Sequence, residues 1–142
     1  MPKMIFVNLP VSDLPRAVAF YEAIGAVKNP QFSDDTGACL VFSETIFAML
    51  LTHETFQQFT PKPISDAKAS SEVLICISED SREAVDAVLE KAGAAGGHPD
   101  INTTVDMGFM YARSFEDPDG HIWEVMWMDP AAVAGKKGPD AA

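Results

Sequence analysis

A single glutamate in an apolar segment is the residue of this sequence that is best placed to do chemistry. Glu124 lies in the run FEDPDGHIWEVMWMD, residues 115–129. Within that run, DPDG at 117–120 predicts a tight turn, because Pro presets φ, Asp bonds its own backbone and Gly accepts positive φ. The apolar residues from 122 to 128 predict a strand that is covered on both faces. A carboxylate there is costly unless it meets a cation, a hydrogen-bond donor or water, so Glu124 is the leading candidate for a functional residue.

The other polar candidates each have a structural alternative. Glu124 could simply pair with Arg113 on the neighbouring strand, and His121 directly follows the turn, where a polar residue often bonds turn backbone. His53 begins a helix-like HETFQQF segment, so it could be a surface or capping residue as well as a site residue. Neither Cys39 nor Cys76 has an obvious activating base nearby in the sequence, which gives no support to nucleophilic catalysis.

Composition limits the kinds of partner and location. The 142 residues carry a formal net charge of -11, and no basic stripe is present that would suit nucleic acid or an anionic membrane. No charged leader with a long apolar core and no apolar span of membrane length is visible, and both cysteines lie in apolar runs that favour the reduced state. We therefore expect a cytoplasmic protein that binds neither nucleic acid nor a membrane.

The elements that must position Glu124 form a repeated order. Residues 4–60 predict β-α-β-β-β, and the second half predicts the same order again over 72–129. A connector without periodicity, 61–71, separates these two modules within one domain, residues 1–130, and the tail 131–142 is expected to be flexible. The predicted elements are strands over 4–9, 26–32, 38–42 and 46–52, a helix capped by Ser12 or Asp13 and ended by Gly25, then strands over 73–77, 98–103, 108–115 and 122–128, with a second helix that Asp80 and Glu83 cap.

Together, the β-α-β-β-β repeat, the segment FVNLPVSDLPRAVAFYEAIGA at 6–26 and the segment DPDGHIWEV at 117–125 resemble the vicinal oxygen chelate superfamily. That superfamily includes glyoxalase I, extradiol dioxygenases, fosfomycin-modifying enzymes and bleomycin-resistance proteins. The resemblance covers residues 4–129 and implies an α+β fold in which two βαβββ modules form a curved mixed sheet with helices outside. It also implies a homodimer.

Metal-using relatives carry ligands at four places, and the resemblance transfers these places to this sequence one by one. They fall on Phe6, Met49, Val73 and Glu124, so only Glu124 matches a metal ligand by type. A lone carboxylate does not hold a catalytic divalent ion well. The cofactor is therefore expected to be either none or a divalent metal ion at Glu124. Asn8 and His53 could add polar groups beside Glu124, on the same faces as Phe6 and Met49.

Two functions remain open. The first is a glyoxalase-like lyase or isomerase of the lactoylglutathione-lyase type, with Glu124 as general base or metal ligand. The second is a metal-free small-molecule binding protein that resembles the bleomycin-resistance proteins, since apolar Phe6, Met49 and Val73 convert a metal cup into a hydrophobic pocket. The ligand-binding residues expected for either function are Asn8, His53, Phe6, Met49, Val73 and Arg113.

Overall fold

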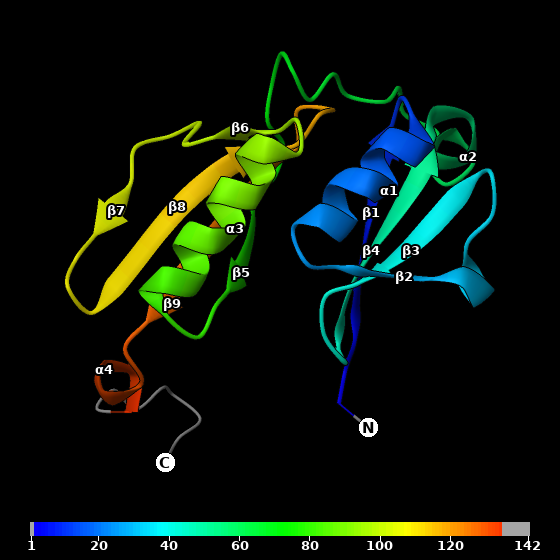
Figure 1. Ribbon diagram of the computed structural model, residues 1–142. Coiled ribbons are helices and arrows are strands. Elements are labelled where there is room, and N and C mark those ends of the chain that lie inside the picture. The colour runs from blue at the N-terminus through cyan, green and yellow to red at the C-terminus, as the bar shows by residue number, and fades with distance from the viewer. Residues whose placement is uncertain (1, 135–142) are drawn as a thin grey trace.

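The computed structural model describes residues 2–134 and has the repeated architecture that the sequence predicts (Figure 1). We call β1 to α2 the first module and β5 to β9 the second module. Residues 58–74 lie between them, so the connector is longer than the predicted 61–71, and from here on the term connector means 58–74. The elements in chain order are β1 (Ile5–Val11), α1 (Leu14–Ala23), β2 (Val27–Asn29), the 3-10 helix η1 (Pro30–Phe32), β3 (Gly37–Val41), β4 (Ile46–Thr52), α2 (His53–Gln57), β5 (Ile75–Ser78), α3 (Arg82–Ala94), β6 (His98–Pro99), β7 (Val105–Asp106), β8 (Met110–Glu116), β9 (Ile122–Met128) and α4 (Pro130–Ala134).

Each module contributes one mixed sheet, and the two sheets have the same strand order. The first is β1-β4-β3-β2 and the second is β5-β9-β8-β6, with β7 pairing to β8. In both sheets the first strand runs parallel to the last, and the remaining pairs are antiparallel. The α+β class and the two βαβββ modules are thus confirmed. Within one chain, however, the sheet is divided, because β1 and β5 each pair on one side only.

Local sequence signals explain where the two long helices begin. The Asp13 side chain accepts from the Arg16 amide at 3.1 Å, so Asp13 is the N-cap of α1. In α3 the N-cap is Ser81, whose hydroxyl accepts from the Ala84 amide at 3.0 Å. The expected cap at Asp80 is therefore wrong by one residue. The Ser81 hydroxyl binds an amide of the first helical turn that has no partner within the helix, so the helix is capped one residue later than expected.

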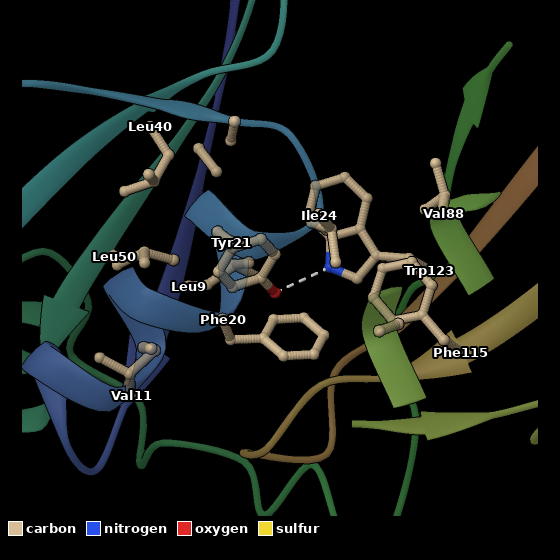
Figure 2. Close-up of a cluster of buried hydrophobic side chains, with 14 of the residues drawn as sticks. Leu9, Val11, Phe20, Tyr21, Ile24, Leu40, Leu50, Val88, Phe115 and Trp123 are labelled. Carbon is tan, nitrogen blue, oxygen red and sulfur yellow. Dashed lines mark hydrogen bonds between the residues drawn. The ribbon is translucent and has the colours of Figure 1, made fainter. Parts of the chain in front are cut away.

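Helix α1 brings the two modules into one hydrophobic core (Figure 2). Its Phe20 lies 5.7 Å from Phe115 of β8, measured between ring centroids, and Tyr21 lies 5.7 Å from Trp123 of β9. Trp123 also lies 5.1 Å from Phe42, which follows β3. Burial of several large aromatic side chains at this junction is the main apolar contribution that holds the modules together.

Several elements differ from the sequence prediction. Strand β5 begins at Ile75, so Val73 lies before the strand in which it was expected, and the short strand β7 was not predicted. Strand β2 stops at Asn29 because Pro30 has no amide hydrogen to donate, and η1 follows in place of the expected strand end. Strand β6 is limited to His98–Pro99. Helix α4 covers residues 130–134, where part of the tail was expected, and residues 135–142 of that tail lie outside the described residues. None of the helices between residues 2 and 134 is long and apolar enough to cross a membrane.

Candidate functional site

Each sheet has a face packed against the core and an opposite face, which we call the open face. On β1, Leu9 is buried while Phe6 and Asn8 are exposed, which is the alternation that a half-buried strand requires. On β9, Trp123 and Val125 are buried while Glu124 is half-buried. The open face of the first sheet therefore carries Phe6, Asn8, Phe47 and Met49, and that of the second carries Cys76, Ile122, Glu124 and Met126.

Glu124 lies in the middle of a cross-strand row on the open face of the second sheet. Its register neighbours are Cys76 of β5 and Ser114 of β8. Among the residues that the structure describes, the Glu124 carboxylate has no hydrogen-bond or ion-pair partner. Partial burial, and then the Glu124 charge, raise the pKa of the Cys76 thiol. The carboxylate is therefore available to a ligand.

Arg113 points away from Glu124. Its register partner on β9 is Val125, which faces the core, so the two side chains lie on opposite faces of the sheet. The guanidinium forms ion pairs with Asp86 at 2.8 Å and with Asp100 at 2.7 Å. Hydrogen bonds to these carboxylates raise the pKa of Arg113. The alternative that Glu124 simply pairs with Arg113 is therefore wrong, because Ser114, and not Arg113, is the register neighbour of Glu124 on its face of the sheet.

A cavity of about 360 Å³, which we call the junction pocket, lies where the two modules and the connector meet. The middle of β1 contributes Asn8, α2 contributes Phe56 and the start of β9 contributes Ile122. Two residues of the sequence-derived site, Asn8 and Val73, line it together. The volume falls within the range of about 300–1,000 Å³ that is usual for ligand pockets.

Close packing against the turn before β9 fixes the connector over this pocket. Gly120 has a φ of +99°, and a Cβ atom on it would lie 2.7 Å from the Lys68 nitrogen and 2.8 Å from the Ala67 carbonyl carbon. Only glycine permits that approach of two backbones without a shift. At the other end, Gln57 Nε2 donates to the carbonyl oxygens of Thr60 at 3.1 Å and Lys62 at 2.8 Å.

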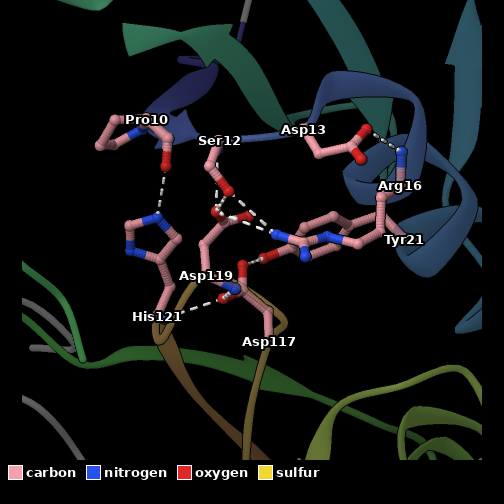
Figure 3. Close-up of polar contacts among 8 residues, drawn as sticks. All are labelled: Pro10, Ser12, Asp13, Arg16, Tyr21, Asp117, Asp119 and His121. Carbon is pink, nitrogen blue, oxygen red and sulfur yellow. Dashed lines mark hydrogen bonds and ion pairs between the residues drawn. The ribbon is translucent and has the colours of Figure 1, made fainter.

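Polar contacts beside the pocket tie the turn of the second module to the first module (Figure 3). The His121 Nε2 atom lies 2.8 Å from the Pro10 carbonyl oxygen, which can only accept, so Nε2 donates. Asp119 Oδ1 accepts from the amide and the hydroxyl of Ser12, both at 2.9 Å, and lies 3.5 Å from the Arg16 guanidinium. These contacts support the structural interpretation of His121.

Asp117 forms the buried end of this network. Its Oδ2 accepts from the Tyr21 hydroxyl at 2.5 Å, and its Oδ1 accepts from the amides of Asp119 at 3.0 Å and His121 at 2.8 Å. Burial raises the pKa of Asp117, against the lowering effect of His121, and burial followed by the Asp117 charge raises the pKa of Tyr21 well above its usual value. Both side chains are almost fully buried, so this network docks the modules and is closed to a ligand.

The remaining sequence-derived candidates are dispersed. Phe6 stacks on Phe47 with ring centroids 4.6 Å apart, and Met49 pairs in register with Asn8 on the same open face. His53 is exposed as the first residue of α2, because β4 ends at Thr52, whose hydroxyl caps the helix. The pocket lining excludes Phe6, Met49, His53 and Glu124. Glu124 lies two residues beyond the pocket residue Ile122, about 7 Å along the same face.

Several pocket residues were not predicted from the sequence. Phe56, which lies in the helix-like HETFQQF segment, lines the junction pocket together with Lys62, Ser70 and Ser71 of the connector, a segment without strand or helix periodicity. The available signal was the concentration of hydroxyl side chains between Thr60 and Ser71. Polar side chains in a loop between two modules are common where a ligand binds at the junction.

The side chains present do not fit a divalent metal ion. No cluster of three or more His, Cys, Asp or Glu residues suitable for a metal exists among residues 2–134. At the four places that the resemblance singled out, Phe6, Met49 and Val73 offer no hard or borderline donor, and the Glu124 carboxylate stands alone. The arrangement suits binding or proton transfer by protein groups.

Comparison with known proteins gives a consistent family and fold. The model of the Glyoxalase/Bleomycin resistance protein/Dioxygenase superfamily matches residues 3–125. No curated protein matches the sequence.

Solved structures share the fold at low sequence identity. A hypothetical protein from S. aureus is 25% identical, with a TM-score of 0.73 over 89% of this chain and 95% of that chain. A glyoxalase/bleomycin resistance protein/dioxygenase family enzyme from Burkholderia phytofirmans is 19% identical, with a TM-score of 0.72 over 89% of this chain and 99% of that chain. The fosfomycin resistance protein FosX from Mesorhizobium loti is 15% identical, with a TM-score of 0.65 over 94% of this chain and 98% of that chain.

Proposed function

Because this chain belongs to the glyoxalase/bleomycin resistance protein/dioxygenase superfamily, we propose that it binds a small molecule in the junction pocket without a metal ion. The observation that carries the proposal is the pocket itself, which combines residues of both modules with the connector. Apolar walls with a few convergent polar groups are typical of small-molecule sites. Phe6, Met49 and Val73, which stand where the resemblance places metal ligands, support the same conclusion.

A thermal-shift screen with and without a blocked pocket tests this function. Ser71 is exposed and lines the pocket, so Ser71→Trp should fill it without disturbing the core. Ala69→Trp is the control, since Ala69 is exposed in the same segment and does not line the pocket. A ligand at about 100 times its dissociation constant adds roughly 2.7 kcal/mol to the free energy of unfolding. The proposal fails if no compound stabilises the wild type and Ala69→Trp more than Ser71→Trp.

A second candidate is a glyoxalase-like lyase or isomerase in which Glu124 acts as general base. The Glu124 carboxylate favours it, because this group has no partner among residues 2–134 and lies two residues beyond the pocket, and a general base needs access to the proton that it removes. In this case Glu124→Gln should abolish turnover by removing the base, while the ligand-dependent thermal shift persists. Loss of both signals together would assign Glu124 to binding.

We also propose that the protein is a homodimer formed through the unpaired edges of β1 and β5. Ile5 and Phe6 at the β1 edge, and Val73 and Leu74 before β5, are exposed by 57%, 47%, 61% and 56%. Natural proteins protect such edges, and a second copy would cover both at once. The open faces, with Glu124 on one sheet and Asn8 on the other, would then border a shared space.

The cytoplasmic location stays a prediction.

A further inference from the structure

Resting on the function proposed above, we propose that the ligand of the junction pocket is a small uncharged polyhydroxy compound. The inference comes from the uneven distribution of chemical groups around the pocket. The connector contributes every serine and threonine of the lining together with several apolar residues, the modules add further apolar residues, and the two charged side chains belong to exposed residues.

The hydroxyl groups of the pocket lining come from the connector. Every serine and threonine that lines the pocket belongs to that segment, namely Thr60, Ser65, Ser70 and Ser71. Within residues 2–134, the hydroxyls of Ser65, Ser70 and Ser71 have no hydrogen-bond partner in the protein. A hydroxyl both donates and accepts, so a row of them complements a ligand that carries hydroxyl groups of its own.

The apolar part of the lining comes from both the modules and the connector. Phe56 of α2 and Ile122 of β9 belong to the modules, and Ile64 and Val73 belong to the connector. A sugar or related cyclic polyol has C–H groups on one face and hydroxyls around its edge. Such a molecule can pack against aromatic and aliphatic side chains while its edge bonds to the connector.

The charged side chains of the lining do not favour a ligand of either charge sign. Lys62 and Glu72 are its one ammonium and one carboxylate, and both side chains belong to exposed residues. His121 already donates through Nε2 to the Pro10 carbonyl, at 2.8 Å. An anion would also be repelled by the net charge of -11, whereas a neutral ligand meets no such cost.

Asn8 adds an amide group to the pocket lining. Its side-chain amide has no hydrogen-bond partner among the described residues, and it lies on the open face of β1. An amide presents a donor and an acceptor side by side. Two adjacent ligand hydroxyls match that pair in a way that a single charged group does not.

Amide NMR of the full chain with four matched probes tests the ligand class. D-glucose is the neutral polyol, glucose 6-phosphate the anion, glucosamine the cation, and cyclohexanol the apolar ring with one hydroxyl. We expect glucose to shift the amides of Ser70, Ser71 and Gly120 saturably, with an affinity at least about tenfold above the other three. The shifts should persist in Ala69→Trp and vanish in Ser71→Trp, with well-dispersed spectra showing that both variants are folded.

The outcomes separate the ligand class from the function. If a charged or apolar probe saturates these amides at lower concentration than glucose, the polyhydroxy class is wrong and small-molecule binding in the pocket stands. The class is equally wrong if glucose gives no saturable shift while a compound from the thermal screen does. If no compound distinguishes Ser71→Trp from Ala69→Trp in either experiment, the proposed function itself fails.

Discussion

The hydroxyl of Tyr21 joins Asp117 to Trp123 across the boundary between the two modules. It donates to Asp117 Oδ2 at 2.5 Å and accepts from Trp123 Nε1 at 2.9 Å. Tyr21 belongs to the first module, whereas both partners belong to the second and lie about a hundred residues further along the chain. A single phenolic oxygen thus satisfies two buried polar groups of the other module.

Tyr21→Phe should lower the free energy of unfolding by roughly 2–3 kcal/mol, because it leaves a buried indole N–H and a buried carboxylate without that partner. The measurement is denaturant unfolding followed by far-UV circular dichroism. Tyr111→Phe is the matched control, since the Tyr111 hydroxyl also donates to an aspartate, Asp86, at 2.6 Å but in an exposed setting. Equal losses in the two variants would contradict a special role for the buried hydroxyl.

Gly120→Ala should destabilise the protein more than Gly96→Ala. Both glycines have a similar positive φ, +99° and +100°, so an alanine at either position is strained by about 1–2 kcal/mol. Only at Gly120 would the new Cβ also meet the connector backbone, at 2.7 Å from the Lys68 nitrogen. Thermal unfolding of the two variants measures the difference. Equal unfolding midpoints would show that the connector backbone moves away from the new Cβ without a loss of stability.

Glu124→Gln should lower the pKa of the Cys76 thiol while leaving it above its usual value, because burial contributes more to the shift than the carboxylate does. The rate of alkylation by iodoacetamide against pH reports that pKa, since the thiolate is the reactive form. Buried Cys39 provides the internal reference and should react slowly in both proteins. An unchanged profile would mean that the two side chains do not sense each other.

The ion pair of Asp106 with Arg82 predicts how the stability of the protein changes with pH. The bidentate hydrogen bond of Asp106 to Arg82, with contacts of 2.8 and 3.0 Å, lowers the pKa of Asp106 from 3.8 to about 2. A depressed carboxyl pKa contributes stability that is present above the unfolded value and is lost as pH falls through the folded one. The unfolding midpoint of Asp106→Asn should therefore lie below that of wild type near neutral pH and converge with it between about pH 4 and 2. A gap that widens on acidification would reverse the assignment.

The dimer proposal predicts concentration-dependent sedimentation. Ile5→Lys places a charge on the unpaired edge of β1, where a second copy would otherwise bury an apolar side chain, so it should shift the protein toward monomer. Val27→Lys is the control, because Val27 is 66% exposed on β2 at the other end of the same sheet. Wild-type protein that sediments as a monomer at every concentration would overturn the proposal.

Local signals were sufficient to predict the modules from the sequence, and they were insufficient for the pocket. The residue types around Asp13, Gly25 and the 117–120 turn encode caps and turns within a few positions, so the element order followed from them. The separation of the strands into two sheets could not be predicted in this way, because the alternation of apolar and polar residues along a strand does not show which strand edges pair. Phe56 and Ser71 were missed because their roles depend on how the connector crosses both modules, a long-range property.

Trp123 is a natural fluorescent reporter at the interface between the two modules. It is one of two tryptophans in the chain, is 1% exposed, and touches Tyr21 and Phe42 of the opposite module. When the modules separate, its indole exchanges the hydrogen bond to Tyr21 for water, and its fluorescence should change. In a Trp127→Phe background, emission from Trp123 alone would follow module separation in real time without an attached dye.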